Sequence, residues 1–172
     1  MTAGMDDSKD TQDAISLLEE QHREVESLFE QIEHASDYED KETLFQELAD
    51  NLAAHSLIEE KIFYPAAYAT ATKKLLNEAV EEHLAVKRIV ADLLEMSPKD
   101  DHFEAKVKVL KEQVEHHVHE EEKELFPKVQ KELDAEQLKT LGAMMEDMFE
   151  DAMDDDPSAN IPAETAEAAR IR

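Results

Sequence analysis

The amino-acid sequence predicts an all-α protein: an up-down-up-down antiparallel four-helix bundle with a short fifth helix and a flexible acidic C-terminal tail. Three observations support this fold class. The 172 residues include only two glycines and five prolines, whereas good helix formers such as Ala, Leu, Glu, Lys and Gln are abundant. Apolar residues recur at steps of three and four, the period of an amphipathic helix. The first half of the chain also resembles the second half.

Apolar periodicity divides the chain into five helices. The expected helices cover residues 13–35, a stretch starting near 41, 72–96, 100–133 and 135–150. Pro65 and Pro127 fall inside the second and fourth patterns, and because proline removes a helical hydrogen bond, each helix should kink or end there. Asp134 stands where it can cap the fifth helix.

The length of the chain fits one domain with additions at both ends. We assign the four-helix region to residues 12–133 and the extra helix to 134–150. Residues 1–11 are expected to form a flexible N-terminus. The tail, 151–172, is acidic, rich in alanine and interrupted by two prolines, so we expect it to be disordered or loosely docked.

Composition and charge exclude several classes of protein. The absence of cysteine excludes thiolate zinc sites, iron–sulfur clusters and disulfide frameworks, and it favours a cytoplasmic location. Lys and Arg total 18 against 44 Asp and Glu, and the net charge of −26 opposes binding to nucleic acid or to anionic membranes. The N-terminus does not resemble a signal peptide, and no apolar stretch approaches the ~20 residues that span a bilayer.

The two halves of the chain align on two prolines. The segment His55–Pro65 matches His117–Pro127 at an offset of 62 residues, and each segment opens with His-x-x-x-Glu. Upstream of these segments, His22 matches His83 at an offset of 61 residues. The chain is therefore two copies of a helix pair, and each copy supplies one lone histidine and one His-x-x-x-Glu. Dinuclear metal sites are built in bundles of this arrangement.

Six polar residues interrupt the apolar stripes of these helices at matching depths. They are His22, His55, Glu59, His83, His117 and Glu121. Because side chains at i and i+4 share a helix face, each His-x-x-x-Glu can direct both side chains to one place. Burying an unpaired carboxylate is costly, so two carboxylates facing four imidazoles require positive charge. Imidazole and carboxylate without thiolate suit iron, with manganese or zinc as alternatives. A metal-free bundle with buried His–Glu networks is the competing interpretation.

The other histidines are weaker candidates as ligands. His34 and His102 lie near helix ends and are expected to be solvated. His116 and His119 point away from the face that carries His117. The alignment on the prolines selects His117 over His116.

Several further residues lie near the predicted site in sequence. Glu26 follows the first histidine by one turn and is a candidate to reach the site. Glu60 and Glu122 are each one position beyond a site glutamate and are expected to face outward. Tyr64 and Tyr68 are candidates to donate to the site or to bound oxygen, although core packing is the favoured role.

The combined pattern resembles the hemerythrin-like family of HHE cation-binding domains over roughly residues 12–133. The resemblance rests on the two lone histidines and on the two His-x-x-x-Glu segments with an aromatic residue and proline after each. It implies a non-haem di-iron centre with two iron ions, oxo- or hydroxo-bridged, whose open positions bind oxygen, peroxide or nitric oxide. The ligands that it implies are terminal His22, His55, His83 and His117, with Glu59 and Glu121 as bridges.

Two features depart from the oxygen carriers of this family. Those proteins place a second histidine one turn after the one in the third helix, where this chain has Lys87. Their fourth helix has a longer spacing ending in Asp instead of His-x-x-x-Glu. The missing neutral ligand leaves a more open and more anionic coordination sphere, which favours oxidised irons and opposes reversible oxygen carriage. The ligand set is closer to the four-His, two-Glu sites of bacterial stress-related members and of a eukaryotic iron-sensing domain.

Three functions follow from this resemblance. The first is a di-iron protein that senses or detoxifies oxygen, peroxide or nitric oxide, with weak catalase-like turnover. The second is an iron- or oxygen-responsive regulatory module without turnover, which reports to a protein partner that the sequence does not identify. The third is a reversible oxygen carrier or store, which Lys87 disfavours.

Overall fold

The computed structural model describes residues 12–171, and every regular element within this range is helical. The all-α prediction is therefore confirmed. The prediction made for residues 1–11 lies outside the described residues. None of the described helices has both the length and the apolar character needed to cross a membrane. The elements are α1 Ala14–His34, α2 Tyr38–Ile58, η1 Glu59–Phe63, α3 Tyr64–Ala67, α4 Lys73–Leu94, α5 Phe103–Glu120, η2 Glu121–Leu125, α6 Phe126–Glu132, α7 Ala135–Met153 and η3 Pro157–Glu164.

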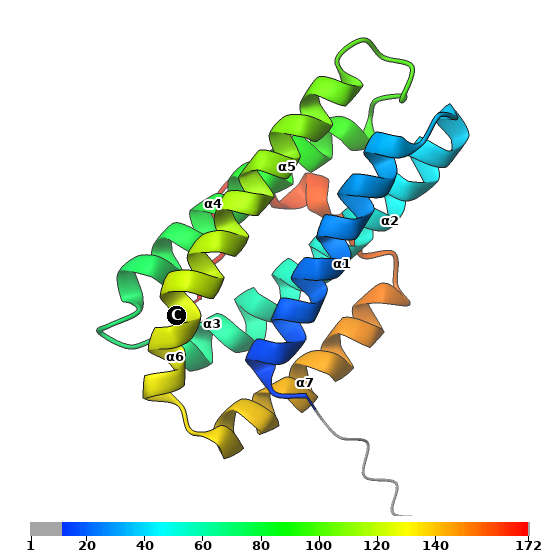
Figure 1. Cartoon of the computed structure of the whole chain (residues 1–172). Helices are drawn as coiled ribbons and strands as arrows, with labels where there is room; N and C mark the ends of the chain where they lie inside the picture. Colours follow the sequence, from blue (N-terminus) through cyan, green and yellow to red (C-terminus); the bar gives the residue numbers. More distant parts are fainter. Residues whose placement is uncertain (1–11, 172) are drawn as a thin grey trace, which may run out of the picture.

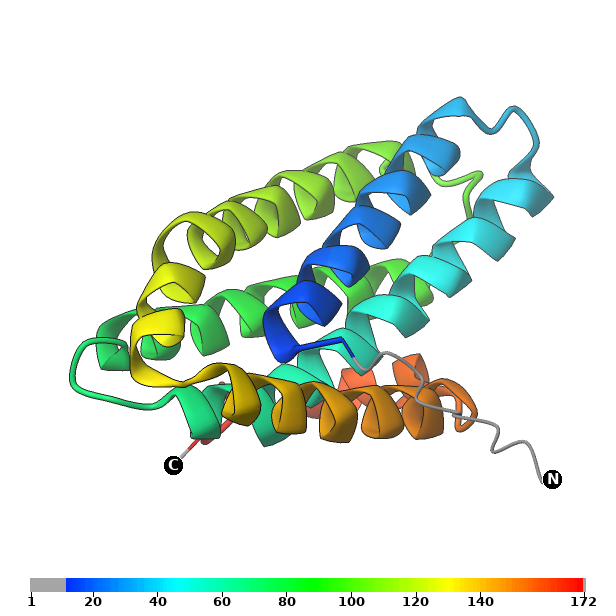
Figure 2. The same ribbon diagram turned by 60° about the horizontal axis from the view of Figure 1, so that its bottom comes forward.

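The four long helices α1, α2, α4 and α5 run lengthwise beside one another (Figures 1 and 2). Helix α1 packs against α2, and α4 packs against α5, so each half of the repeated sequence forms a helix hairpin. Helix α7 crosses one end of the molecule and contacts α1 and α2 (Figure 2). The 3₁₀ segment η3 lies against α2 and α4.

Local side chains set the starts of the helices. Asp13 caps α1 by accepting a hydrogen bond from the backbone N–H of Ser16 at 2.8 Å. Asp134 caps α7 in the same way, accepting from the backbone N–H of Gln137 at 2.9 Å. The Gln137 side chain accepts from the Asp134 backbone in return, which completes a capping box.

Two π-helical turns lie at matching places in the two halves. Helix α2 passes directly into η1, and α5 passes directly into η2. In each turn a backbone N–H donates to the carbonyl five residues earlier, and the acceptors are Glu59 and Glu121. Pro65 and Pro127 follow in the first turns of α3 and α6, where a missing N–H costs least. The predicted helix breaks are therefore π turns, a feature frequently found at functional sites.

A polar layer divides the core into two apolar clusters. On α1, His22 lies between Leu18 of one cluster and Val25 of the other. The same order holds on α4 around His83. Because well-packed apolar residues hold each helix on both sides of the layer, the positions of the histidines are set by the core itself.

The C-terminal segment is docked on the helices. Ile161 and Ile171 are buried, and each belongs to one of the two apolar clusters. Arg88 of α4 donates to the backbone carbonyls of Thr165 at 2.9 Å and Ala166 at 3.3 Å. Of the two alternatives that the sequence left open for the tail, disorder and loose docking, the contacts of these residues favour docking. Ile161 and Ile171 anchor the tail. They are single apolar residues that do not form the repeating apolar face of a helix, so helical periodicity in the sequence does not indicate that the tail is docked.

Candidate metal centre

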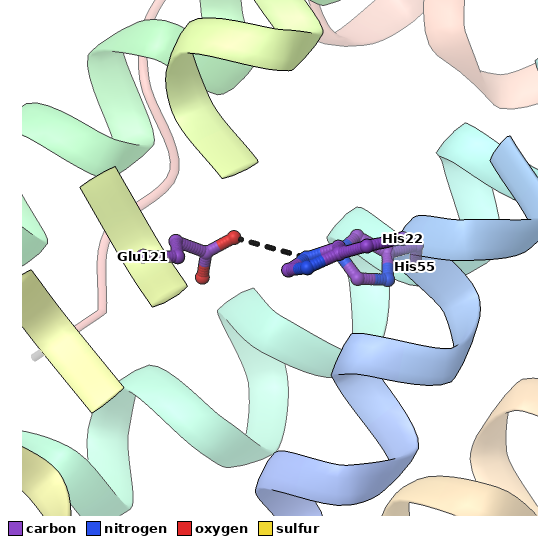
Figure 3. Close-up of side chains that lie close together, drawn as sticks. All are labelled: His22, His55 and Glu121. Atoms are coloured by element: carbon purple, nitrogen blue, oxygen red, sulfur yellow. Dashed lines mark ion pairs between the residues drawn. The ribbon is translucent and has the colours of Figure 1, made fainter. Parts of the chain in front are cut away.

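The six residues predicted as ligands converge in one buried layer, each at most 7% exposed. They come from α1, α4 and the junctions of α2 with η1 and of α5 with η2. Their donor atoms form two groups, and within each group these atoms lie within 4.8 Å of one another. Group one, shown in Figure 3, is His22, His55 and Glu121, and group two is Glu59, His83 and His117.

Each glutamate lies between histidines of both halves of the chain. Oε1 of Glu59 lies 2.7 Å from Nε2 of His55 and 3.5 Å from Nε2 of His83. Glu121 repeats this pattern. Its Oε1 lies 2.8 Å from Nε2 of His117 and 3.5 Å from Nε2 of His22, and Figure 3 shows the second of these contacts. Both carboxylates thus lie between imidazoles contributed by the two halves of the chain.

The Nδ1 atoms of two imidazoles face partners within their own half of the chain. Nδ1 of His55 lies 2.7 Å from Oε1 of Gln21. Nδ1 of His117 lies 3.0 Å from Oε1 of Glu82. Gln21 and Glu82 immediately precede the two lone histidines, so the duplication also supplies these supporting residues.

The other two imidazoles face the opposite half. Nδ1 of His83 lies 2.8 Å from Oε1 of Glu60, which also accepts from Nζ of Lys87 at 3.0 Å. Nδ1 of His22 lies 3.8 Å from Oε2 of Glu122, beyond hydrogen-bond distance. The prediction that Glu60 faces outward is wrong, whereas Glu122 is partly exposed and pairs with the exposed Arg23. A position beside the core stripe of a bundled helix faces the neighbouring helix, and Glu60 is buried there.

The donor atoms of the layer fit metal ions. Nε2 of His83 and Nε2 of His117 lie 3.2 Å apart, so a shared proton or a cation must lie between them. Several buried atoms of the layer have no hydrogen-bond partner among the described residues. They are both carboxylate oxygens of Glu59, Oε1 of Glu121 and both ring nitrogens of His22. The carboxylate oxygens lie close to imidazoles but outside hydrogen-bonding geometry. Because each buried polar atom without a partner costs about 1–3 kcal/mol, the layer is unfavourable without cations.

Charges within the layer shift its pKa values. Burial lowers the pKa of His117, but the carboxylates of Glu121, Glu82 and Glu59 together outweigh burial and raise this pKa well above its ordinary value. Burial acts against the charge of Glu59, yet His55 holds the pKa of Glu59 well below its ordinary value. Protonated imidazoles therefore balance the carboxylates in the metal-free protein, and bound cations would replace those protons.

Tyr64 adds a proton donor to the layer. Its fully buried hydroxyl donates to Oε2 of Glu121 at 3.1 Å and lies 3.2 Å from Nε2 of His83. Burial, followed by the charges of Glu121 and Glu59, raises the pKa of Tyr64 well above its ordinary value, so the hydroxyl stays protonated. Tyr64 thus has both roles that the sequence allowed, core packing and a contact with the site. The second copy has Phe126 at the matching position, so the repeat alone does not predict this donor.

The remaining candidates lie outside the layer. Glu26 is partly exposed and pairs with Arg23 at 3.2 Å. His116 pairs at the surface with Glu82 at 3.2 Å and Glu120 at 3.1 Å. The histidines that the sequence disfavoured as ligands are all exposed: His34, His102, His116 and His119.

A small cavity of about 30 Å³ adjoins the four histidines. The rest of its wall is mostly apolar and consists of Val25, Leu52, Ser56, Val86, Val114 and Val118. A space of this size holds about one or two water molecules or a ligand of similar size. The cavity therefore has room beside the imidazoles only for a ligand of a few atoms.

The family model described as Hemerythrin HHE cation binding domain matches residues 13–129. The chain belongs to this family. A crystal structure of a hemerythrin HHE cation-binding domain-containing protein from Mycobacterium kansasii has the same fold, with a TM-score of 0.74 and 28% sequence identity. The match covers 83% of this chain and 88% of the mycobacterial chain. The resemblance drawn from the sequence is thereby confirmed, and the hemerythrin fold accounts for the layer of histidines and glutamates.

Two curated proteins are also similar to this hemerythrin domain. A DNA nickase of Nostoc sp. is 28% identical over 116 residues, which cover 67% of this chain and 33% of the nickase. An uncharacterized hemerythrin-like protein of Schizosaccharomyces pombe is 27% identical over 119 residues, covering 67% of this chain and 59% of that protein. The chain thus matches one third of the first relative and about three fifths of the second.

Proposed function

We propose that this hemerythrin domain holds two iron ions in its buried layer and reacts with oxygen, peroxide or nitric oxide, for sensing or detoxification. In this proposal the α1–α2 and α4–α5 hairpins form an up-down-up-down bundle around the ions. The four histidines of the layer would be terminal ligands, and Glu59 and Glu121 would be bridges. Two bound irons would together supply the two electrons that weak catalase-like turnover of peroxide requires, next to the cavity.

The observation that supports this proposal most strongly is the cavity beside unsatisfied donor atoms. His22, whose ring nitrogens have no hydrogen-bond partner among the described residues, forms part of the wall of a space of about 30 Å³ together with the other three imidazoles. Valine and leucine side chains line most of that space, and an apolar surrounding strengthens electrostatic interactions inside it. The Tyr64 hydroxyl donates to Glu121 at 3.1 Å, so a hydrogen-bond donor lies within the layer.

Lys87 supports an oxidant-reactive site over an oxygen carrier. Its ammonium group is held by Glu60 at 3.0 Å and by Glu164 at 3.3 Å. The lysine is therefore engaged outside the layer and does not replace the histidine that oxygen carriers have there. In our proposal the resulting sphere of four histidines and two glutamates leaves more positions open to ligands.

The proposal is tested by adding oxygen, peroxide and nitric oxide separately to iron-loaded protein and recording absorption spectra. Val114→Phe should fill the cavity and suppress the spectral response while iron content stays unchanged. Val109→Phe is the matched control, because Val109 is 47% exposed on the same helix and should leave the response intact. Absence of any spectral change with all three ligands in the unsubstituted protein would contradict the proposal.

A second candidate function is an iron- or oxygen-responsive regulatory module without turnover. The docked C-terminal segment favours it, because Glu164 contacts Lys87 and Lys87 contacts Glu60, the partner of His83. Under this alternative, loss of iron would loosen the segment and present it to a protein partner. Limited proteolysis should then cut the segment faster in metal-free protein, and equal cutting rates with and without iron would argue against a regulatory role.

The similarity to a DNA nickase does not lead us to propose nucleic acid as a partner. The matched region is one third of that protein, and the net charge of −26 opposes contact with phosphate backbones. We propose instead a cytoplasmic protein whose ligand is a small oxidant. No binding of a fluorescent duplex at low salt is the expected result.

A further inference from the structure

The imidazoles of group two, His83 and His117, are both supported by carboxylates. Nδ1 of His83 lies 2.8 Å from Glu60, and Nδ1 of His117 lies 3.0 Å from Glu82. A carboxylate that accepts from Nδ1–H fixes the orientation of the ring and makes Nε2 a more basic ligand. Both histidines of this group therefore present strengthened donor atoms to the layer.

The imidazoles of group one, His22 and His55, have weaker support. Nδ1 of His55 faces the neutral amide of Gln21 at 2.7 Å. His22 has no hydrogen-bond partner among the described residues, because Glu122 is 3.8 Å away. Glu122 is held instead by Arg23, whose Nη2 lies 2.6 Å from Oε2 of Glu122. Neither histidine of this group is hydrogen-bonded to a carboxylate through Nδ1.

The charged side chains around the supporting residues also favour a cation at group two over group one. Behind group two, three carboxylates, those of Glu60, Glu82 and Glu164, are opposed by the single positive charge of Lys87. Behind group one, two carboxylates, those of Glu122 and Glu26, are opposed by the single positive charge of Arg23. Group two therefore has one uncompensated negative charge more than group one, and a cation is stabilised there by both ligand basicity and Coulomb attraction.

We propose that the two metal positions are inequivalent, and that the position formed by Glu59, His83 and His117 binds its cation first and more tightly. One part of the difference is the contrast between Gln21 and Glu82, which occupy the same place in the two copies of the repeat. The other part is the contact of Glu60 with His83, which Glu122 does not make with His22. This inference rests on the proposed metal site. It implies that the weaker ion, beside His22 and His55, is the one that exchanges with the surroundings.

The test is a Zn²⁺ titration of the metal-free full chain, followed by calorimetry and by ¹H–¹⁵N spectra of the imidazole rings. The His116→Ala background removes the surface imidazole that shares Glu82. The imidazole signals of His83 and His117 should change first, and the two dissociation constants should differ by about 10- to 100-fold, the usual effect of such supporting partners.

Exchanging the two supporting residues leaves each group with one carboxylate-supported histidine and moves the extra negative charge behind group one, so the order should invert through that charge. In the double variant Gln21→Glu, Glu82→Gln, the signals of group one should change first. Both substitutions keep side-chain size and an acceptor oxygen, so the fold should survive, which far-ultraviolet circular dichroism checks. Glu78→Gln is the matched control, because this exposed residue lies one turn before Glu82 on α4 and should leave the order unchanged.

The outcomes separate this inference from the proposed function. Two ions that bind with equal affinity, or in an order that the exchange leaves unchanged, would overturn the inference while leaving the metal pair in place. Failure of the unsubstituted protein to bind two ions would overturn both. Sequential binding that the exchange inverts would support the inference.

Discussion

Glu59 has no exposed surface, and neither of its carboxylate oxygens has a hydrogen-bond partner among the described residues. A buried carboxylate in this state is stabilised by cations, so its charge should be needed for metal binding. Glu59→Gln is expected to reduce the metal content from two ions per chain to one or fewer, as measured by mass spectrometry of the metals. Glu24→Gln, at an exposed position of α1, should retain both ions. Two ions retained by Glu59→Gln would rule out the bridging role.

Tyr64 donates its hydroxyl proton to Glu121 inside the layer. Tyr64→Phe leaves that carboxylate oxygen without a donor, so the metal-free protein should lose about 1–3 kcal/mol of unfolding free energy in urea. Tyr38→Phe serves as the control, because Tyr38 is 53% exposed and should change stability little. Equal losses for the two variants would mean that the buried hydrogen bond has no stabilising effect.

The helices could be predicted from local sequence because their apolar residues repeat with the period of a helix. The π turns could not be predicted, since their hydrogen bonds to Glu59 and Glu121 leave no distinctive residue pattern apart from the prolines that follow. Glu60 was misplaced for a related reason. Glu60 is buried because α4 brings His83 and Lys87 against it. The apolar pattern of a single helix does not show which residues of a neighbouring helix lie against it.

Helix α7 was expected as an extra element, but its docking position depends on a single glycine. A Cβ atom on Gly142 would collide with the backbone of Gln12 and Asp13 at the start of α1. Glycine to alanine normally stabilises a helix by about 0.5–1 kcal/mol. Here Gly142→Ala should instead destabilise the protein by about 1–3 kcal/mol, because the backbone must shift to make room.

The sign of this change separates the two effects. Urea unfolding followed by circular dichroism measures the difference in free energy between the variant and the unsubstituted protein. A stabilised Gly142→Ala variant would show that α7 does not pack closely on the start of α1.

At the scale of the whole molecule, the duplication made the site predictable. Six ligand candidates were identified because the two halves repeat them at the same depth, and the structure brings all six into one layer. The supporting residues follow the same repeat, but their difference between copies, Gln21 against Glu82, acquires meaning only when the distances to the imidazoles are known. The docking of the tail depends on contacts with helices that are distant in sequence. The tail lies outside the repeated halves, so the repeat does not predict where it docks.

The charge balance of the layer predicts an unusual pH dependence for the metal-free protein. The pKa of His117 is raised, so its stabilising contribution is complete below about 6.5 and is lost as pH rises through the folded-state pKa. The pKa of Glu59 is lowered, so its contribution is present above about 4.5 and is lost as pH falls. Metal-free protein should therefore be most stable between these values.

Metal ions should remove the loss of stability at high pH, because they replace the protons on the imidazoles. Melting temperatures of metal-free and iron-loaded protein, recorded from pH 5 to pH 9, are expected to diverge above about pH 7. A metal-free protein that melts at a higher temperature at pH 8.5 than at pH 6 would contradict this assignment of charges.

The central claim is that one interior layer of four imidazoles and two carboxylates holds a pair of iron ions. Anomalous X-ray scattering from crystals of the iron-loaded protein, measured on both sides of the iron absorption edge, tests it most directly. Two iron peaks should lie within the layer, one near His22 and His55 and the other near His83 and His117. A single peak, peaks only at the surface near His116, or no peak in the layer would contradict the claim.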